Sequence, residues 1–159
     1  MAPTSNTAMQ FIKTGTGETF TIGPITVRVL EDGSHTDNRV GAVEIIVPPA
    51  TDQTPLHLHR MHDETFLITK GAIRFNTGDK NFDAQAGDYV VMPVGVAHTF
   101  SNPFGDTGVF FNTFSPAYYV NYLRELSGFA KTGQLTPQNV LRIMAHYAIE
   151  PGQSRSLDG

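Results

Sequence analysis

The sequence contains no cysteine and no tryptophan, and only 16% of its 159 residues are charged. Without cysteine there is no disulfide framework, no thiolate nucleophile and no cysteine-based zinc site. Lysine and arginine form no cluster, and the formal net charge is −4. Because binding to phosphate groups requires a basic patch, this distribution argues against a nucleic-acid partner.

Long hydrophobic runs are also missing. No apolar stretch approaches the length that spans a bilayer, so the sequence predicts no membrane partner. The first residues, Met-Ala-Pro-Thr-Ser-Asn-Thr-Ala, have neither the basic nor the apolar region of a signal peptide. From these absences we expect a cytoplasmic protein.

Glycine and proline, by contrast, are frequent, with 15 and 10 copies. They separate many short runs with strand character, a pattern typical of a β-sandwich or β-barrel. No internal repeat is visible, and the length suits a single domain over residues 1–159. The predicted strands cover residues 19–22, 25–30, 40–47, 56–59, 64–69, 72–76, 89–92, 98–101 and 108–114.

The pattern changes to helix after Pro116. Apolar residues recur every three or four positions from Tyr119 to Phe129, which predicts a helix with one apolar face. Thr136 and Pro137 then have the residue types of an N-cap and a first helical position, and an apolar stripe follows as far as Tyr147. We expect this helical hairpin to pack on the barrel. Its tyrosines either fill the contact or line a substrate entrance.

Three histidines and one glutamate form the most informative pattern. His57 and His59 are one residue apart, so they share a face if the segment is extended. Glu64 follows after a short interval, and His98 comes later in the chain. Three nitrogens and one oxygen suit one divalent ion of Fe, Mn, Ni, Co, Cu or Zn, whereas Mg and Ca prefer oxygen ligands alone.

The segment around His98 reads as a strand, a tight turn and a second strand. Pro93 cannot donate a ladder hydrogen bond, and Gly95 tolerates the backbone angles of a tight turn. Gly87 precedes the first of these strands, and Asn102 ends the second. The segment therefore places His98 near the start of a strand.

Together the two segments resemble the paired motifs of the cupin family. His57, His59, Glu64 and Gly71 match the first motif at the permitted spacing. The five residues that match the second motif without a gap are Gly87, Pro93, Gly95, His98 and Asn102. The first glycine of the first motif is replaced by Thr51, a turn position that does not bind the metal.

The resemblance implies a fold and a ligand set. The expected fold is all-β, a double-stranded β-helix or jelly-roll barrel over roughly residues 18–115, with a helical extension over roughly 116–150. His57, His59, Glu64 and His98 are the expected metal ligands. The family pattern has no ligand at the position of His62, so we expect a solvated turn residue there. Asp63 is also expected to be exposed, and Asn102 to hold backbone groups or outer contacts of the site.

An apolar pocket is expected above the metal. Along an extended strand, Phe66 and Ile68 share a face with Glu64, and Phe100 shares a face with His98. With Phe111 and Phe114 they form the predicted wall for a planar aromatic substrate. A plain hydrophobic core is the alternative interpretation of the same residues.

Among cupins, the single barrel, the ligand set and the helical tail resemble flavonol dioxygenases of the quercetinase type. The resemblance implies an aromatic small-molecule substrate and O2 as partners. Glu64 would be the catalytic residue, a ligand that also acts as general base, with its pKa raised by burial beside the aromatic wall. The metal would act as a Lewis acid.

Two alternatives stay open. The first is a non-oxidative metal enzyme, a decarboxylase, isomerase or cyclase that acts on a small secondary metabolite. The second is a ligand-binding cupin without catalysis. Because an unprotected strand edge invites pairing, we also expect a homodimer.

Overall fold

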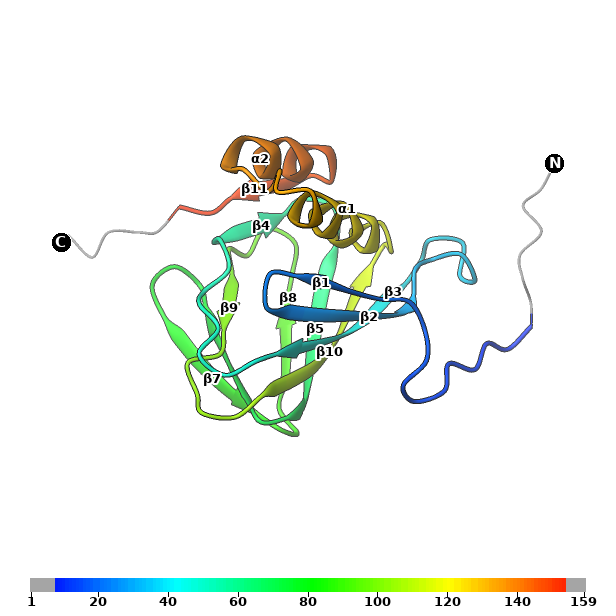
Figure 1. The fold of residues 1–159 in the computed structure, drawn as a ribbon, viewed down its shortest axis with the longest axis horizontal. Helices are drawn as coiled ribbons and strands as arrows, with labels where there is room; N and C mark the ends of the chain where they lie inside the picture. Colours follow the sequence, from blue (N-terminus) through cyan, green and yellow to red (C-terminus); the bar gives the residue numbers. More distant parts are fainter. Residues whose placement is uncertain (1–7, 154–159) are drawn as a thin grey trace.

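The structure is a computed structural model that describes residues 8–153. Strands dominate the first three quarters of this range, and two helices follow (Figure 1). The helices are α1 (Tyr119–Lys131) and α2 (Pro137–His146). The strands are β1 (Thr19–Ile22), β2 (Ile25–Glu31), β3 (Gly41–Val47), β4 (His57–His59), β5 (Asp63–Lys70), β6 (Ala72–Asn76), β7 (Asn81–Gln85), β8 (Tyr89–Met92), β9 (Thr99–Ser101), β10 (Gly108–Ser115) and β11 (Ile149–Pro151).

The strands pair antiparallel into three sheets. The large sheet has the order β1-β2-β3-β10-β5-β8, and a smaller sheet has the order β7-β6-β9. The third sheet is the pair of β11 and β4. Strands that are distant in sequence, such as β3 and β10, therefore lie side by side, as a jelly-roll requires.

The core lies between the sheets because every second side chain of each long strand points inward. Along β10 the buried residues alternate with more exposed ones. Phe66, Phe75 and Phe110 meet at its centre, with ring centroids 5.0 Å apart for Phe66 and Phe75 and 5.5 Å apart for Phe66 and Phe110. Each of the three is at most 3% exposed.

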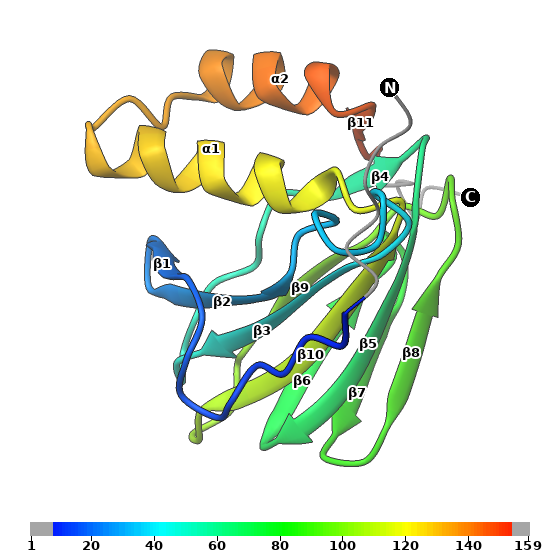
Figure 2. The ribbon, with the colours of Figure 1, turned by 90° about the vertical axis from the view of Figure 1, so that its right-hand side faces the viewer.

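The two helices cover one end of the barrel, as Figure 2 shows. Helix α1 buries the stripe predicted from its spacing, including Tyr119, Tyr122 and Leu123. Thr136 is the N-cap of α2, and its side-chain oxygen accepts a hydrogen bond from the backbone N–H of Asn139 at 3.2 Å. This confirms the predicted helix start. The mostly β fold with two C-terminal helices is likewise as predicted.

Two strands of the structure, β7 and β11, are not among those predicted from the sequence. Strand β7, Asn-Phe-Asp-Ala-Gln, alternates polar and apolar residues, but it is short, contains no β-branched residue and is exposed along most of its length. Strand β11 has three residues and includes Pro151, which normally weighs against a strand. It lies at the edge of its two-stranded sheet, where a missing backbone N–H is tolerated. Pro151 therefore belongs to a strand that pairs with β4.

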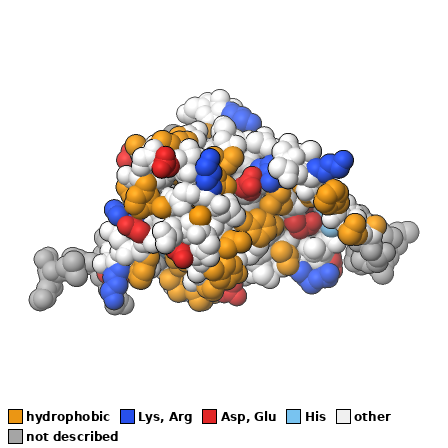
Figure 3. Space-filling view, turned by 90° about the horizontal axis from the view of Figure 1, so that it is seen from below, with side chains coloured by type: hydrophobic (Ala, Val, Ile, Leu, Met, Phe, Trp, Pro, Cys, Tyr) orange, Lys and Arg blue, Asp and Glu red, His pale blue; other side chains and the backbone are white. Residues whose placement is uncertain are grey.

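Charged side chains of both signs are scattered between exposed hydrophobic ones on the face drawn in Figure 3. Among the described residues, no helix is long and apolar enough to cross a membrane.

Candidate metal centre

Four side chains, from two strands and from the residue just before a third, converge beneath the helices. His57 and His59 lie on β4, Glu64 lies on β5, and His98 directly precedes β9. Backbone hydrogen bonds in both directions join His57 and His98, with N···O distances of 3.1 and 2.8 Å. The strand that carries two of the histidines is thus tied directly to the third.

Glycines of the two motifs allow this arrangement. Gly71 has a φ of 62°, and a Cβ atom there would lie 2.4 Å from the carbonyl oxygen of Thr107. Gly95 also has a positive φ, 85°, in the turn before His98. Thr51, which replaces the first glycine, forms a bridge with Asn102, and the positive φ belongs to Ala50 instead. The departure therefore leaves the centre intact.

The candidate ligand atoms are close enough to share one ion. Atoms of His57, His59 and His98 all lie within 4.8 Å of one another. The carboxylate oxygen Oε2 of Glu64 lies 2.8 Å from Nε2 of His98 and 3.2 Å from Nε2 of His59. His59, Glu64 and His98 are each 2% exposed. Such a buried cluster of nitrogens and a carboxylate is compatible with a transition-metal ion.

Hydrogen bonds to backbone carbonyls orient two of the rings. Nδ1 of His57 lies 2.8 Å from the carbonyl oxygen of Pro55, and Nδ1 of His98 lies 2.9 Å from that of Val96. A carbonyl only accepts, so Nδ1 carries the proton in both rings and Nε2 is left to bind a metal. Both ring nitrogens of His59 are buried and neither makes a well-aligned hydrogen bond in the described structure, although Nε2 lies 3.2 Å from Oε2 of Glu64. Buried polar atoms normally have partners, so the residues present fit a bound cation.

Charge in the cluster is distributed unevenly. Burial alone would raise the pKa of Glu64, but His59 and His98 outweigh burial and hold that pKa well below its usual range. The raised pKa expected from the sequence is therefore wrong, because the carboxylate faces histidines as well as aromatic rings. Burial acts to lower the pKa of His98, but its hydrogen bond with Glu64 raises it. Burial and the neighbouring His98 and His59 lower the pKa of His57 to about 4.

His62 differs from its expected position. It is 1% exposed, so it is not a solvated turn residue. Its ring lies 4.2 Å from that of His59 and 5.0 Å from that of Tyr119, measured between centroids. Burial and His59 lower its pKa to about 4. The chain turns inward at His62, whereas Asp63 is exposed as expected and accepts a hydrogen bond from the backbone N–H of Val94.

As expected, the side chain of Asn102 forms hydrogen bonds with backbone groups. It is fully buried, and its side-chain nitrogen donates to the carbonyl oxygens of Val47 and Asp106. Its side-chain oxygen accepts from the backbone N–H of Phe104. The asparagine thus braces the chain at the end of the His98 segment.

A cavity of about 190 Å³ opens beside the cluster. His57, Glu64 and His98 line it, so the carboxylate and two of the histidines face the same space. Most other lining residues are apolar and come from the sheets and both helices: Ile22, Ile25, Val27, Ile45, Phe66, Phe100, Leu123, Leu126, Leu135, Val140 and Met144. The other polar lining residues are Thr54, Asn112, Tyr119 and Tyr122.

Only two of the five residues predicted for the pocket wall line the cavity. Phe66 and Phe100 line the cavity. Ile68 shares the inner face with them but lies in the core, away from the lining. Phe114 is also a core residue, packed against Tyr119 with 5.2 Å between ring centroids. Phe111 is on the opposite face of β10 from the buried Phe110 and Asn112, because strand side chains alternate.

For two tyrosines of helix α1, the sequence left open whether they fill the contact with the barrel or line a substrate entrance. Tyr119 and Tyr122 line the cavity, and their rings stack at 4.9 Å between centroids. Burial and the charge of Glu64 raise the pKa of both hydroxyl groups. The helical spacing places both on the buried face, but the spacing alone does not reveal that this face meets a cavity.

Comparison with known proteins agrees with this architecture. Residues 43–114 match the family described as "Cupin domain". None of the curated proteins is a significant match to the sequence.

Three solved structures illustrate the likeness. The polyketide cyclase RemF from Streptomyces resistomycificus has 18% identity and a TM-score of 0.61, covering 74% of this chain and 94% of that one. KdgF from Halomonas sp. has 17% identity and a TM-score of 0.60, covering 69% and 94%. An RmlC-like cupin from Shewanella frigidimarina NCIMB 400 has 24% identity and a TM-score of 0.59, covering 69% and 93%. At these identities the likeness concerns the fold alone, a mostly β cupin fold followed by two C-terminal helices.

Proposed function

We propose that this chain is a metal-dependent enzyme that isomerises or cyclises a small, apolar carbonyl compound without consuming oxygen. The observation that carries the proposal is the position of Glu64 and two histidines on the wall of a largely apolar cavity. This combination suits a substrate that is held by its hydrocarbon part and activated at a single polar group. RemF, whose fold is similar, is described as a polyketide cyclase, a reaction class consistent with this choice.

The size of the cavity supports a small substrate. Its volume of about 190 Å³ is below the range of about 300–1,000 Å³ that is common for drug-sized ligands. A substrate of one or two rings suits this space better than a flavonol. The apolar walls exclude water, which strengthens every electrostatic contact at the reacting group.

The residues of the chain have separate tasks in this proposal. His57, His59, His98 and Glu64 would hold the ion, which when bound supplies Lewis acidity at the substrate oxygen. Glu64, whose carboxylate lines the cavity, accepts the proton that leaves the carbon next to the carbonyl. It then returns that proton at the new position of the product. The hydroxyl of Tyr119, which takes part in no hydrogen bond within the described structure, is available to the substrate.

A second candidate is the oxidative one, cleavage of a flavonol or related phenolic enol by O2. The aromatic side chains of Phe66 and Phe100 on the cavity wall favour it, because they would stack with a planar ring. The ligand set is the same, so the distinction lies in the co-substrate.

One experiment separates the candidates. Protein loaded separately with Mn, Fe, Co, Ni, Cu or Zn is incubated with a panel of phenolic and enolisable carbonyl compounds, under nitrogen and in air. We expect product under nitrogen, with metal required and no oxygen uptake. Product that forms only in air, with matching oxygen uptake, would favour the dioxygenase. Ligand binding that survives metal removal, with no product in either atmosphere, would indicate a non-catalytic binder.

A further inference from the structure

His62 is a buried polar side chain that the proposed reaction does not use. It is 1% exposed, and neither of its ring nitrogens has a hydrogen-bond partner in the described structure. Its surroundings are aromatic, with Tyr119 at 5.0 Å and Phe114 at 6.3 Å between ring centroids. An imidazole has one donor and one acceptor even when neutral, and burying both without partners is unfavourable. Packing alone would be served better by an apolar residue.

A bound metal ion would give His62 the partner that no neighbouring side chain among the described residues provides. One ligand atom from each of His59, His62 and Glu64 lies within 4.8 Å of the other two, and all three residues are buried. This set shares His59 and Glu64 with the four ligands of the proposed centre, and His62 is its own member. Two imidazoles and a carboxylate are donors typical of Fe, Zn and related ions. Neither ring nitrogen of His59 makes a well-aligned hydrogen bond in the described structure, so both are available as metal ligands.

We propose that His62 is a metal ligand and that His59, His62 and Glu64 form a second position for a divalent transition-metal ion. The inference rests on the metal centre of the proposed function and extends it by one ligand that the cupin motifs do not contain. His57, Glu64 and His98 line the cavity, whereas His59 and His62 do not. The second position therefore lies on the core side of the first, behind the ligands that face the substrate.

Direct metal measurements test this inference without an activity assay. The wild type, His62→Phe and His62→Gln are titrated with Cu²⁺ and Zn²⁺, and the ions bound per chain and the dissociation constants are determined by competition with a chelator. Pulsed electron paramagnetic resonance of the Cu²⁺ samples reports the coordinated histidine nitrogens. His35→Phe is the matched control, because His35 contacts Glu31 at the end of β2 and belongs to neither ligand set.

We expect both His62 variants to lose an ion per chain or to bind at least tenfold more weakly, and to lose histidine nitrogen coupling. The control should match the wild type. Phenylalanine fills the space of the imidazole, and glutamine keeps a polar group. If one variant fails to fold, metal binding by the other variant still tests whether His62 is a ligand. Equal stoichiometry, dissociation constants within twofold and superposable spectra in a folded variant would overturn the inference.

The outcomes also separate this inference from the proposed function. If the His62 variants lose metal but the loaded wild type turns over nothing in either atmosphere, the ligand assignment stands and the proposed function fails. If the wild type is active and the variants bind metal normally, only the ligand assignment fails. A wild type that binds neither ion overturns both.

Discussion

At the scale of single residues, the centre depends on which nitrogen each histidine keeps free. Carbonyl groups of Pro55 and Val96 hold the Nδ1 protons of His57 and His98, so Nε2 of each ring points to the cluster. Glu64 lies between two histidines, which keeps its carboxylate ionised. A cation or a shared proton is required between Glu64 and Nε2 of His98, because both atoms are otherwise acceptors at 2.8 Å.

Replacing Glu64 by glutamine tests its role as base. An amide does not accept the substrate proton, so we expect turnover to fall by about 100-fold or more. The amide oxygen still has a lone pair for the metal, and metal content should stay largely intact. Steady-state kinetics and elemental analysis on the same samples measure both. Glu44→Gln is the control, since Glu44 pairs with Arg28 away from the cavity; full activity in Glu64→Gln would rule out the base role.

Metal-free protein should lose stability as the pH falls from about 6.5 to about 4. The pKa values of His57 and His62 are lowered from 6.5 to about 4, so the unfolded chain binds more protons in this window. Each histidine accounts for a loss of about 3 kcal/mol at the acidic end. The low pKa of Glu64 acts in the same direction. The raised pKa of His98 acts oppositely, since its contribution is present below about 6.5 and lost at higher pH.

Urea denaturation of the metal-free protein at several pH values measures this dependence. His62→Phe removes one of the lowered groups, so its stability should fall less steeply with acidification. A free energy of unfolding that stays constant between these pH values would contradict the assigned environments.

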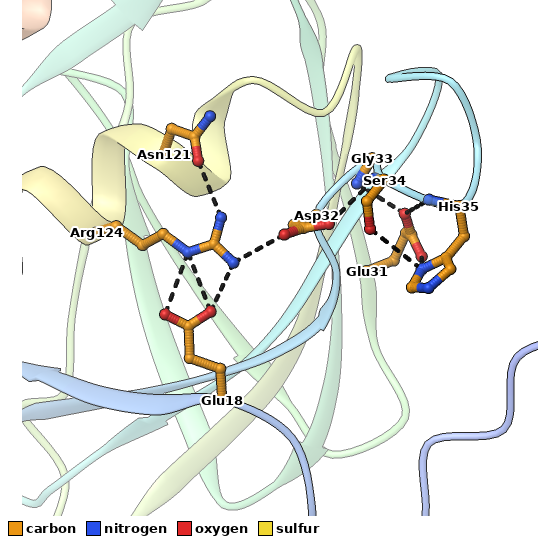
Figure 4. Close-up of polar contacts among 8 residues, drawn as sticks. All are labelled: Glu18, Glu31, Asp32, Gly33, Ser34, His35, Asn121 and Arg124. Carbon is orange, nitrogen blue, oxygen red and sulfur yellow. Dashed lines mark hydrogen bonds and ion pairs between the residues drawn. The ribbon is translucent and has the colours of Figure 1, made fainter. Parts of the chain in front are cut away.

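At the scale of elements, an ion-pair network attaches helix α1 to the barrel. Arg124 donates to Glu18 and Asp32, with shortest distances of 2.6 and 2.8 Å, and also to Asn121 (Figure 4). Burial would raise the pKa of Asp32, but hydrogen bonds from Arg124 and Ser34 lower it to about 2. The network fixes the helix that carries Tyr119 and Tyr122, so it bears on the shape of the cavity.

Arg124→Met should loosen this attachment. Because the network is partly exposed, we expect a loss of about 1 kcal/mol in the free energy of unfolding. Hydrogen exchange should speed up in α1 more than in the strands. Arg74→Met is the matched control, since Arg74 pairs with Asp83 across two strands away from the helices. Unchanged exchange in α1 would show that apolar packing alone holds the helix.

At the scale of the whole molecule, strand β11 supports strand β4, which carries His57 and His59. Ile149 is opposite His59 and Pro151 is opposite His57 in the pairing of β11 with β4. Further backbone hydrogen bonds link Arg60 with Ala148 and Gly152 with Leu56, at 2.9 and 2.8 Å. The chain thus returns from the helices to brace the segment that holds two histidines.

A chain that ends at Tyr147 should bind metal at least tenfold more weakly, because β4 loses its ladder partner and the buried side chain of Ile149. A chain that ends at Gln153 keeps β11 and is the control. Chelator competition measures the affinity, and thermal unfolding monitors the fold. Equal affinity in both truncated chains would mean that the bridge between His57 and His98 suffices to hold β4.

Much of this protein follows from local patterns. The spacing of His57, His59, Glu64 and His98 indicated the cluster, because strand alternation and a turn are short-range properties. Apolar periodicity and the cap at Thr136 likewise predicted the two helices. By contrast, Phe111 was assigned to the pocket although it is on the other face of β10, because its parity relative to the metal ligands depends on strand pairing.

Local sequence patterns were enough to predict the strand-rich domain, the helical tail and the types of donor at the cluster. The inward turn of His62, the pairing of β11 with β4 and the position of two α1 tyrosines on the cavity wall became evident only in the folded chain. The reason is physical: donor types and periodicity are written in neighbouring residues, whereas burial and strand pairing depend on contacts between segments far apart in the chain.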